Sequence, residues 1–216
     1  MQFFQIKVTL KHTKPPIWRR IIVAPEISLH RLHDVLQIAM GWDNSHLYQF
    51  ETPDGFFADP SFEMEETQNS RKTSLNSVLY RTKSSIRYDY DFGDGWEHQI
   101  LLEKVVDLDR SVLAFCLGGA RSSPPEDCGG PWGYANLLAS LKDPKNPEHE
   151  SMIEWVGPEF DPEAFDVEAI NRQLARLAPP QSKKTAQKKA SAIRTVGRGA
   201  TQPRLPIVKS DFDLLR

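Results

Sequence analysis

Residues 86–106, IRYDYDFGDGWEHQILLEKVV, carry the pattern of a β-hairpin with an acidic tip. Apolar and aromatic residues alternate with polar ones, as in a strand that buries one face. Gly93-Asp94-Gly95 follows, and glycine and aspartate are typical of tight turns. WEHQILLEKVV then returns as the second strand. A chain built around such a hairpin must bury the aromatic face, formed by Ile86, Tyr88, Tyr90 and Phe92.

The acidic tip is the first candidate site. If the loop is Gly93–Gly95, Asp91 lies opposite Glu97 on the polar face, and His98 lies half-buried beside Tyr90. Two carboxylates opposite each other repel and invite a cation, with Asp94 close by. Three interpretations stay open: a turn whose acids pair with an arginine, a divalent-metal or polar-ligand site, and a catalytic site.

The rest of the body predicts a mixed fold. Residues 3–10, 17–23 and 46–51 have strand patterns. Residues 29–40 have a helical pattern that Ser28 can cap and Gly41 can end. Helices are also expected at 135–141, 146–157 and 166–177, whereas 52–73 and 116–134 are expected to be loops. We predict an α+β fold: a mostly antiparallel sheet with a β-β-α start and helices packed on one side.

The charge changes sign along the chain. Residues 178–216 hold nine Lys or Arg and two Asp, a net charge of +7, so residues 1–177 carry −9. We therefore predict a folded domain over 1–177 and a basic, largely disordered tail over 178–216. No run of 18 apolar residues and no secretion signal is present, so a cytoplasmic protein without a membrane partner is expected.

The segment 116–134, CLGGARSSPPEDCGGPWGY, is the second candidate site. Cys116 and Cys128 are a thiol pair without the closely spaced pairs typical of structural zinc. They are expected to be reduced thiols that hold a loop, with a metal site or a disulfide as alternatives. Further metal or ligand candidates are Arg121, Glu126 and Asp127.

Other histidines and aromatic residues add weaker candidates. His30 and His33 lie one turn apart on the first predicted helix and His46 follows it, so the three are a candidate metal set, although histidines on a helix flank are usually solvated. Trp96, Trp132 and Tyr134 are candidates for an aromatic ligand groove.

Several segments together resemble one family. PPIWRRIIV, LHDVLQIAMGW, SHLYQFE, YDYDFGDGWEHQILLEK, PPEDCGGPWGY and FDPEAFDVEAIN occur in this order between residues 15 and 171. In these motifs the chain resembles the plasmid pRiA4b ORF-3-like family, also met as passenger proteins of mobile elements. The resemblance implies a compact α+β domain and no particular reaction or cofactor. It leaves out the basic tail.

Three functions remain open from the sequence. The first is a non-catalytic module that binds a protein or a small ligand, because no nucleophile elbow, phosphate loop, zinc-protease helix or dinucleotide fingerprint is present. The second is a metal-dependent hydrolase that joins the hairpin 88–98 to the 116–134 loop, with a divalent metal as cofactor. The third is a nucleic-acid accessory protein that acts through its tail.

Overall fold

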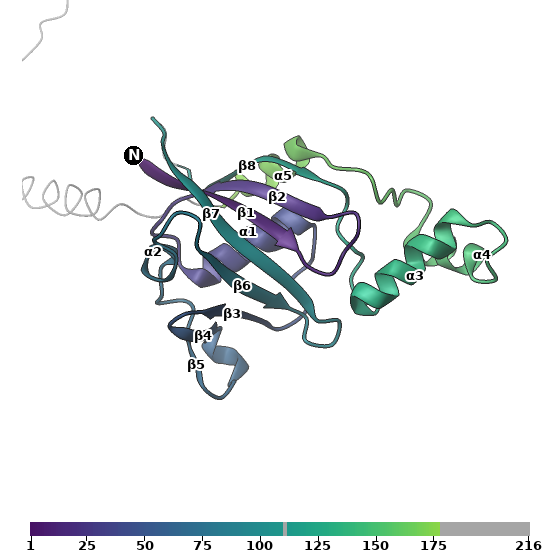
Figure 1. The fold of residues 1–216 in the computed structure, drawn as a ribbon, viewed down its shortest axis with the longest axis horizontal. Helices are drawn as coiled ribbons and strands as arrows, with labels where there is room; N and C mark the ends of the chain where they lie inside the picture. The colour runs from purple at the N-terminus through teal and green to yellow at the C-terminus, as the bar shows by residue number, and fades with distance from the viewer. Residues whose placement is uncertain (110–111, 178–216) are drawn as a thin grey trace, which may run out of the picture. The chain divides into compact units, whose positions relative to one another are not determined.

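The computed structural model describes residues 1–109 and 112–177 (Figure 1). The predicted disorder of residues 178–216 therefore lies outside the described residues. Along the chain the elements are β1 (Gln2–Leu10), β2 (Ile17–Val23), α1 (Leu29–Met40), β3 (Tyr48–Thr52), β4 (Gly55–Ala58), the 3-10 turn η1 (Pro60–Phe62), β5 (Thr67–Asn69), α2 (Leu75–Val78), β6 (Ser85–Tyr90), β7 (Trp96–Asp107), β8 (Ala114–Ala120), α3 (Gly130–Lys142), α4 (His149–Val156) and α5 (Val167–Leu174).

The strands form one eight-stranded sheet in the order β5-β4-β3-β6-β7-β1-β2-β8. Every pairing is antiparallel except the short one between β4 and β5. The predicted α+β class, the mostly antiparallel sheet and the β-β-α start are confirmed. Among the described residues, no helix has the length and apolar character needed to cross a bilayer.

The core lies between the sheet and α1, which crosses behind the sheet in Figure 1. Alternate residues of β1 (Phe4, Ile6, Val8 and Leu10) are buried against the helix, as a two-residue period requires. The predicted caps of α1 are present. The Ser28 hydroxyl accepts a hydrogen bond from the Arg31 N–H at 3.2 Å, and the backbone of Gly41 is in the left-handed conformation. Helix α5 packs on β8 and α1, on the same side of the sheet.

The predicted register of the hairpin is wrong by two residues. Tyr90 pairs with Trp96, Asp89 with Glu97 and Tyr88 with His98, so the loop spans Asp91 to Gly95. The backbone of Asp91 adopts the left-handed conformation. Its carboxylate accepts hydrogen bonds from the backbone N–H groups of Gly93 and Asp94 at 2.9 and 3.3 Å. The acid opposite Glu97 is therefore Asp89. Because the shift is an even number, the residues that remain in the strands keep their predicted faces. Phe92, predicted to be buried, instead lies in the loop and is 48% exposed.

The two predicted loops contain regular structure. Residues 52–73 include β4, η1 and β5, and residues 116–120 belong to β8, which lies at the edge of the sheet. The sequence pattern did not predict β8 as a strand, because its glycines weaken the strand propensity of the segment. Gly119 is needed there: a Cβ at this position would lie 2.6 Å from the Trp18 carbonyl oxygen and 2.7 Å from the Phe165 ring. Helix α3 also begins at Gly130, earlier than predicted.

The exposed edge of β8 is closed by one side chain. The Asn171 amide oxygen accepts the Cys116 N–H at 2.8 Å, and its nitrogen donates to the Cys116 carbonyl at 2.9 Å. The amide thus replaces a neighbouring strand at this position. It fixes α5 to the sheet and blocks edge-to-edge association there.

We predict that Asn171→Ala lowers the free energy of unfolding by about 1–3 kcal/mol, because two backbone groups of β8 lose their partners. Chemical denaturation monitored by circular dichroism measures this change. Arg172→Ala, at a 66% exposed side chain on the same helix, is the control and should change stability by less than about 0.5 kcal/mol. Equal stability of the two variants would refute the role of the amide.

Candidate cation site at the hairpin tip

The two candidate loops of the sequence meet in the structure. The Asp94 carboxylate, at the tip of the β6–β7 hairpin, accepts the Gly129 N–H at 3.2 Å. Gly130 packs so closely against the tip that a Cβ would overlap the Asp94 carbonyl oxygen. Glycine at this position therefore lets the start of α3 lie directly on the hairpin. The contact brings Glu126 and Asp127 to the side of Asp91.

His46 stands at the centre of the resulting cluster. Its Nδ1 lies 3.7 Å from an Asp91 oxygen, and its Nε2 lies 3.3 Å from Asp127 and 3.8 Å from Glu126. One donor atom each from His46, Asp91 and Asp127 lie within 4.8 Å of one another. Asp91 is buried, His46 is partly buried and Asp127 is exposed, so the cluster opens to solvent on one side.

Glu126 is held so that one oxygen is bound and the other is free. Its Oε1 accepts the Tyr90 hydroxyl at 3.0 Å and the Asp43 N–H at 3.1 Å. Its Oε2 is buried without a hydrogen-bond partner, as is the Nε2 of His46, 3.8 Å away. Burial raises the pKa of Glu126 above its ordinary value. Buried polar atoms without partners are costly, and a cation between these two would satisfy both.

A closed ring of hydrogen bonds positions the loop that carries His46. The Asn44 N–H donates to Gln37 at 3.0 Å, and Gln37 donates to the Tyr88 hydroxyl at 3.0 Å. The His33 Nε2 lies 2.6 Å from the Asn44 amide oxygen, which can only accept, so Nε2 carries the proton. The His33 Nδ1, 2.7 Å from Tyr88, therefore accepts the tyrosine proton. The ring ties α1 and β6 to the segment next to His46.

The donor atoms of the cluster fit a first-row divalent cation. Zinc binds imidazole nitrogen and carboxylate oxygen at about 2.0–2.2 Å, which in a tetrahedral site separates neighbouring ligand atoms by about 3.4 Å. The separations from the His46 Nε2, 3.3 and 3.8 Å, are close to this value. Imidazole favours zinc over magnesium or calcium, and carboxylates also suit manganese.

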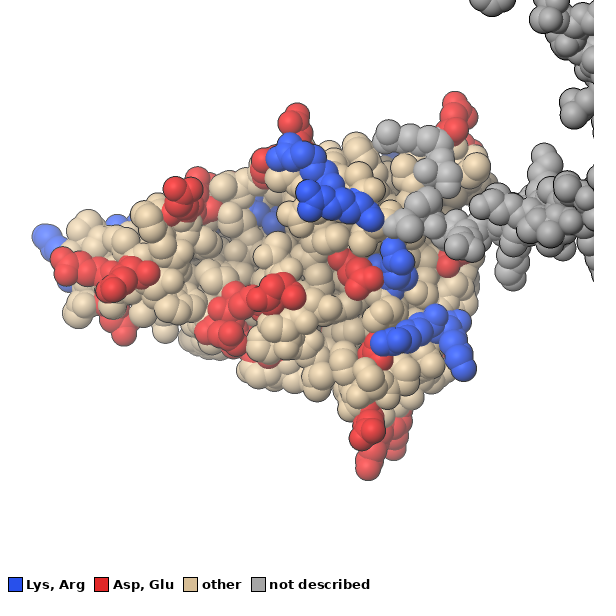
Figure 2. Space-filling model, turned by 180° about the vertical axis from the view of Figure 1, so that it is seen from behind, with Lys and Arg blue, Asp and Glu red and all other residues tan. Residues whose placement is uncertain are grey.

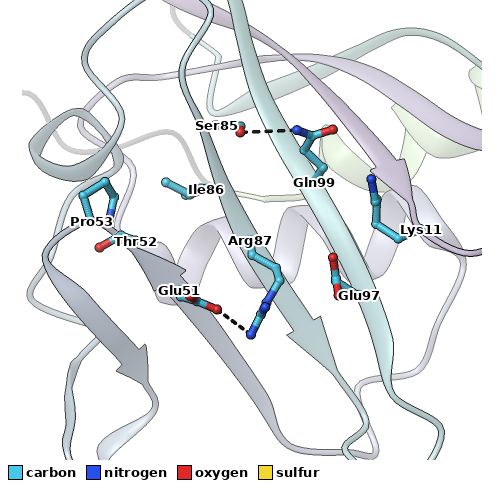
Figure 3. Close-up of a pocket in the computed structure, with 9 residues that line it drawn as sticks. All are labelled: Lys11, Glu51, Thr52, Pro53, Ser85, Ile86, Arg87, Glu97 and Gln99. Atoms are coloured by element: carbon cyan, nitrogen blue, oxygen red, sulfur yellow. Dashed lines mark hydrogen bonds and ion pairs between the residues drawn. The ribbon is translucent and has the colours of Figure 1, made fainter.

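The remaining acidic and basic candidates lie elsewhere. Glu97 is on the uncovered face of the sheet, 3.8 Å from His12 and beside Lys11, in a hollow that also holds the Glu51–Arg87 ion pair (Figure 3). His98 is buried in the core opposite Tyr88, not half-buried beside Tyr90, and burial lowers its pKa to about 4. Arg121 is buried and pairs with Glu163.

The thiol pair and the aromatic candidates also separate. Cys116, in β8, and Cys128, before α3, are free thiols whose pKa values burial raises, which makes them poor nucleophiles. Trp96 and Tyr134 are buried in the core, whereas Trp132 is 84% exposed on α3. The three aromatic side chains therefore do not line one groove.

The three histidines grouped from the sequence do not form one cluster, because only His30 and His33 lie side by side, with ring centroids 6.5 Å apart. His33 belongs to the hydrogen-bonded ring, and the His30 Nδ1 lies 2.9 Å from the Tyr48 hydroxyl and 3.2 Å from Asp59. His46 joins the acids because β3 pairs with β6, which places Tyr48 opposite Tyr90. Only this pairing order could have shown that His46 approaches the hairpin tip, since Asp91 lies 45 residues after His46 along the chain.

We predict that His33 stays neutral, with its proton on Nε2, down to a pH of about 4. Burial lowers the pKa of His33 to about 4, whereas the unfolded side chain titrates near 6.5. The unfolded state thus binds more protons between these values, so this histidine lowers stability by up to about 1.4 kcal/mol per pH unit as pH falls from about 6.5 to about 4. Nitrogen NMR of the ring reports the tautomer. Protonation near pH 6.5 would contradict the proposed ring.

Comparison with known proteins agrees with the fold. Residues 2–169 match the family described as Plasmid pRiA4b ORF-3-like protein. The uncharacterised protein y4hQ of Sinorhizobium fredii is 40% identical over 187 residues, covering 85% of this chain and 96% of y4hQ. The crystal structure of MM3350 from Methanosarcina mazei Go1, a protein of unknown function, has a TM-score of 0.70 at 33% identity and covers 77% and 96% of the two chains. The chain belongs to the plasmid pRiA4b ORF-3-like protein family.

Proposed function

We propose that this protein is a binding module that holds a divalent cation through the Nε2 of His46, Glu126 and Asp127, with Asp91 beside the Nδ1 of the same ring. The observation that carries the proposal is a pair of buried atoms without hydrogen-bond partners, the His46 Nε2 and the Glu126 Oε2, which face each other at 3.8 Å beside two more carboxylates. The cation would join the hairpin tip to the loop before α3. Zinc and manganese suit the mixed nitrogen and oxygen donors best.

The hydrolase hypothesis depends on the same site. It requires the hairpin and the 116–134 loop to converge, and the contacts of Asp94 with Gly129 and of His46 with Asp127 support that requirement. The exposed side of the cluster, at Asp127, would leave a coordination position for water. However, Arg121, a ligand candidate from the sequence that could bind an anionic substrate, is paired with Glu163. The geometry therefore supports cation binding more directly than catalysis.

The nucleic-acid hypothesis gains no support from the folded body. The body carries a net charge of −9. On the helix-covered side, Lys and Arg side chains stand in small separate groups among acidic and uncharged ones (Figure 2). A nucleic-acid interface normally needs a continuous basic surface. The basic residues expected to act in this way lie at 178–216, outside the described residues.

We predict that saturating Zn²⁺ or Mn²⁺ stabilises the protein. At a cation concentration 100 times the Kd, the gain is about 2.7 kcal/mol, or about 5–10 °C in melting temperature for a domain of this size. Differential scanning fluorimetry after EDTA treatment, with elemental analysis of the untreated protein, measures the effect. His46→Gln and Asp127→Asn should each remove most of the shift.

Glu97→Gln is the matched control, because it neutralises an acid of the same hairpin on the opposite face of the sheet. It should retain the full shift. If no divalent cation raises the melting temperature of the wild type and the purified protein contains no metal, the proposal is wrong. A shift that is equal in the His46 and Glu97 variants would place a cation elsewhere.

A further inference from the structure

A second site lies next to the cluster, on the helix-covered side of the sheet. A groove with a cavity volume of about 480 Å³ runs between the end of α1, the 122–126 loop and α5. Its volume falls within the range of small-molecule sites. Its apolar wall includes Ile38, Val156, Phe160, Phe165 and Ile170. These side chains pack against the core but are only partly buried.

Arg19 lies at the inner wall of this groove and has no carboxylate partner among the described residues. The residue is only 3% exposed, and its guanidinium carbon lies 4.9 Å from the centre of the Phe165 ring. Burial lowers the pKa of Arg19 to about 10. Buried charges are normally paired with an opposite charge. The partial negative charge at the C-terminal end of α1 compensates the positive charge of Arg19 only in part.

The hydrogen bonds of Arg19 leave one donor free. Its Nε donates to the Ala39 carbonyl at 2.7 Å, and its Nη1 donates to the carbonyls of Trp18 and Ala120 at 2.9 and 3.0 Å. Its Nη2 donates only to the Ser123 hydroxyl, at 3.2 Å. A guanidinium has five N–H donors, so one N–H of Nη2 remains. The four bonds fix the side chain, so that donor is held in place.

Ser123 offers a second donor at the same end of the groove. Its hydroxyl donates to the Met40 sulfur at 3.7 Å, which is a weak hydrogen bond. The hydroxyl can rotate toward a better acceptor. An N–H of Arg19 and the O–H of Ser123 together match the two oxygens of one carboxylate.

We propose that this groove binds a small amphipathic carboxylate, with its acid group at Arg19 and Ser123 and its apolar body along Phe160, Phe165 and Ile170. The two acids that line the groove do not occupy the position of the ligand. The Asp166 carboxylate accepts the Ala169 N–H at the start of α5, and the bound oxygen of Glu126 faces Tyr90 and Asp43. Binding of the carboxylate needs no cation, so this site is independent of the function proposed above.

Titration calorimetry with three probes of one chain length tests the proposal on the full chain in EDTA. Sodium octanoate should bind with a 1:1 ratio, about tenfold or more tighter than octanol, because hydrogen bonds to a charged group are stronger than those to a neutral one. Octylammonium, a cation, should not bind. Equal affinity for octanoate and octanol would overturn the role of Arg19.

One pair of variants locates the binding without touching Arg19. Ala169→Phe fills the groove from α5 and should abolish octanoate binding. Glu168→Phe adds the same ring at an 85% exposed neighbour that does not line the groove, and it should bind octanoate like the wild type. Circular dichroism confirms that both variants fold. Octanoate binding that survives Ala169→Phe, or no binding to the wild type, would refute the proposal.

Discussion

The need to satisfy three buried tyrosine hydroxyls organises this fold. Tyr48, Tyr88 and Tyr90 come from the neighbouring strands β3 and β6, and each is fully buried. A hydroxyl buried without a hydrogen bond costs several kcal/mol, so each one requires a partner from another element. Tyr48 meets His30 and Ser70, Tyr88 meets His33 and Gln37 of α1, and Tyr90 meets Glu126. These contacts bind the helix and two loops to the sheet.

The candidate cation site follows from the same requirement. Tyr90 holds one oxygen of Glu126 and leaves the other facing His46, and the ring through Tyr88 fixes the segment that carries His46. Asp91 is in place because its carboxylate closes the hairpin loop. Hydrogen bonds of polar groups in the core therefore position the side chains of a site at the surface. Buried polar groups also shape the groove at Arg19. The buried guanidinium donates to three backbone carbonyls and to the Ser123 hydroxyl, and one of its N–H donors remains free.

Local patterns predicted the elements well where one principle dominated. Alternation gave β1, β2, β6 and β7, and the capping residues Ser28, Gly41 and Asp166 gave the ends of α1 and the start of α5. The glycine-rich strand β8 and the short strands β4 and β5 were missed, because their pairing is supplied by neighbours that are distant along the chain. The sequence patterns also indicated Asp91, Glu126 and Asp127 as site residues, whereas they placed His46 with His30 and His33 and not with these acids.

The sequence by itself determined the fold class, the two segments that meet at the candidate site and the faces of the residues within the strands, because a two-residue period assigns each side chain to a face. Only the tertiary structure decided which residues meet. The Asp91 turn lengthened the hairpin loop, which parted Asp91 from Glu97, and the pairing of β3 with β6 brought His46 to Asp91. Contacts between distant segments depend on strand order and close packing, as at Gly130 against Asp94, and no local pattern encodes them.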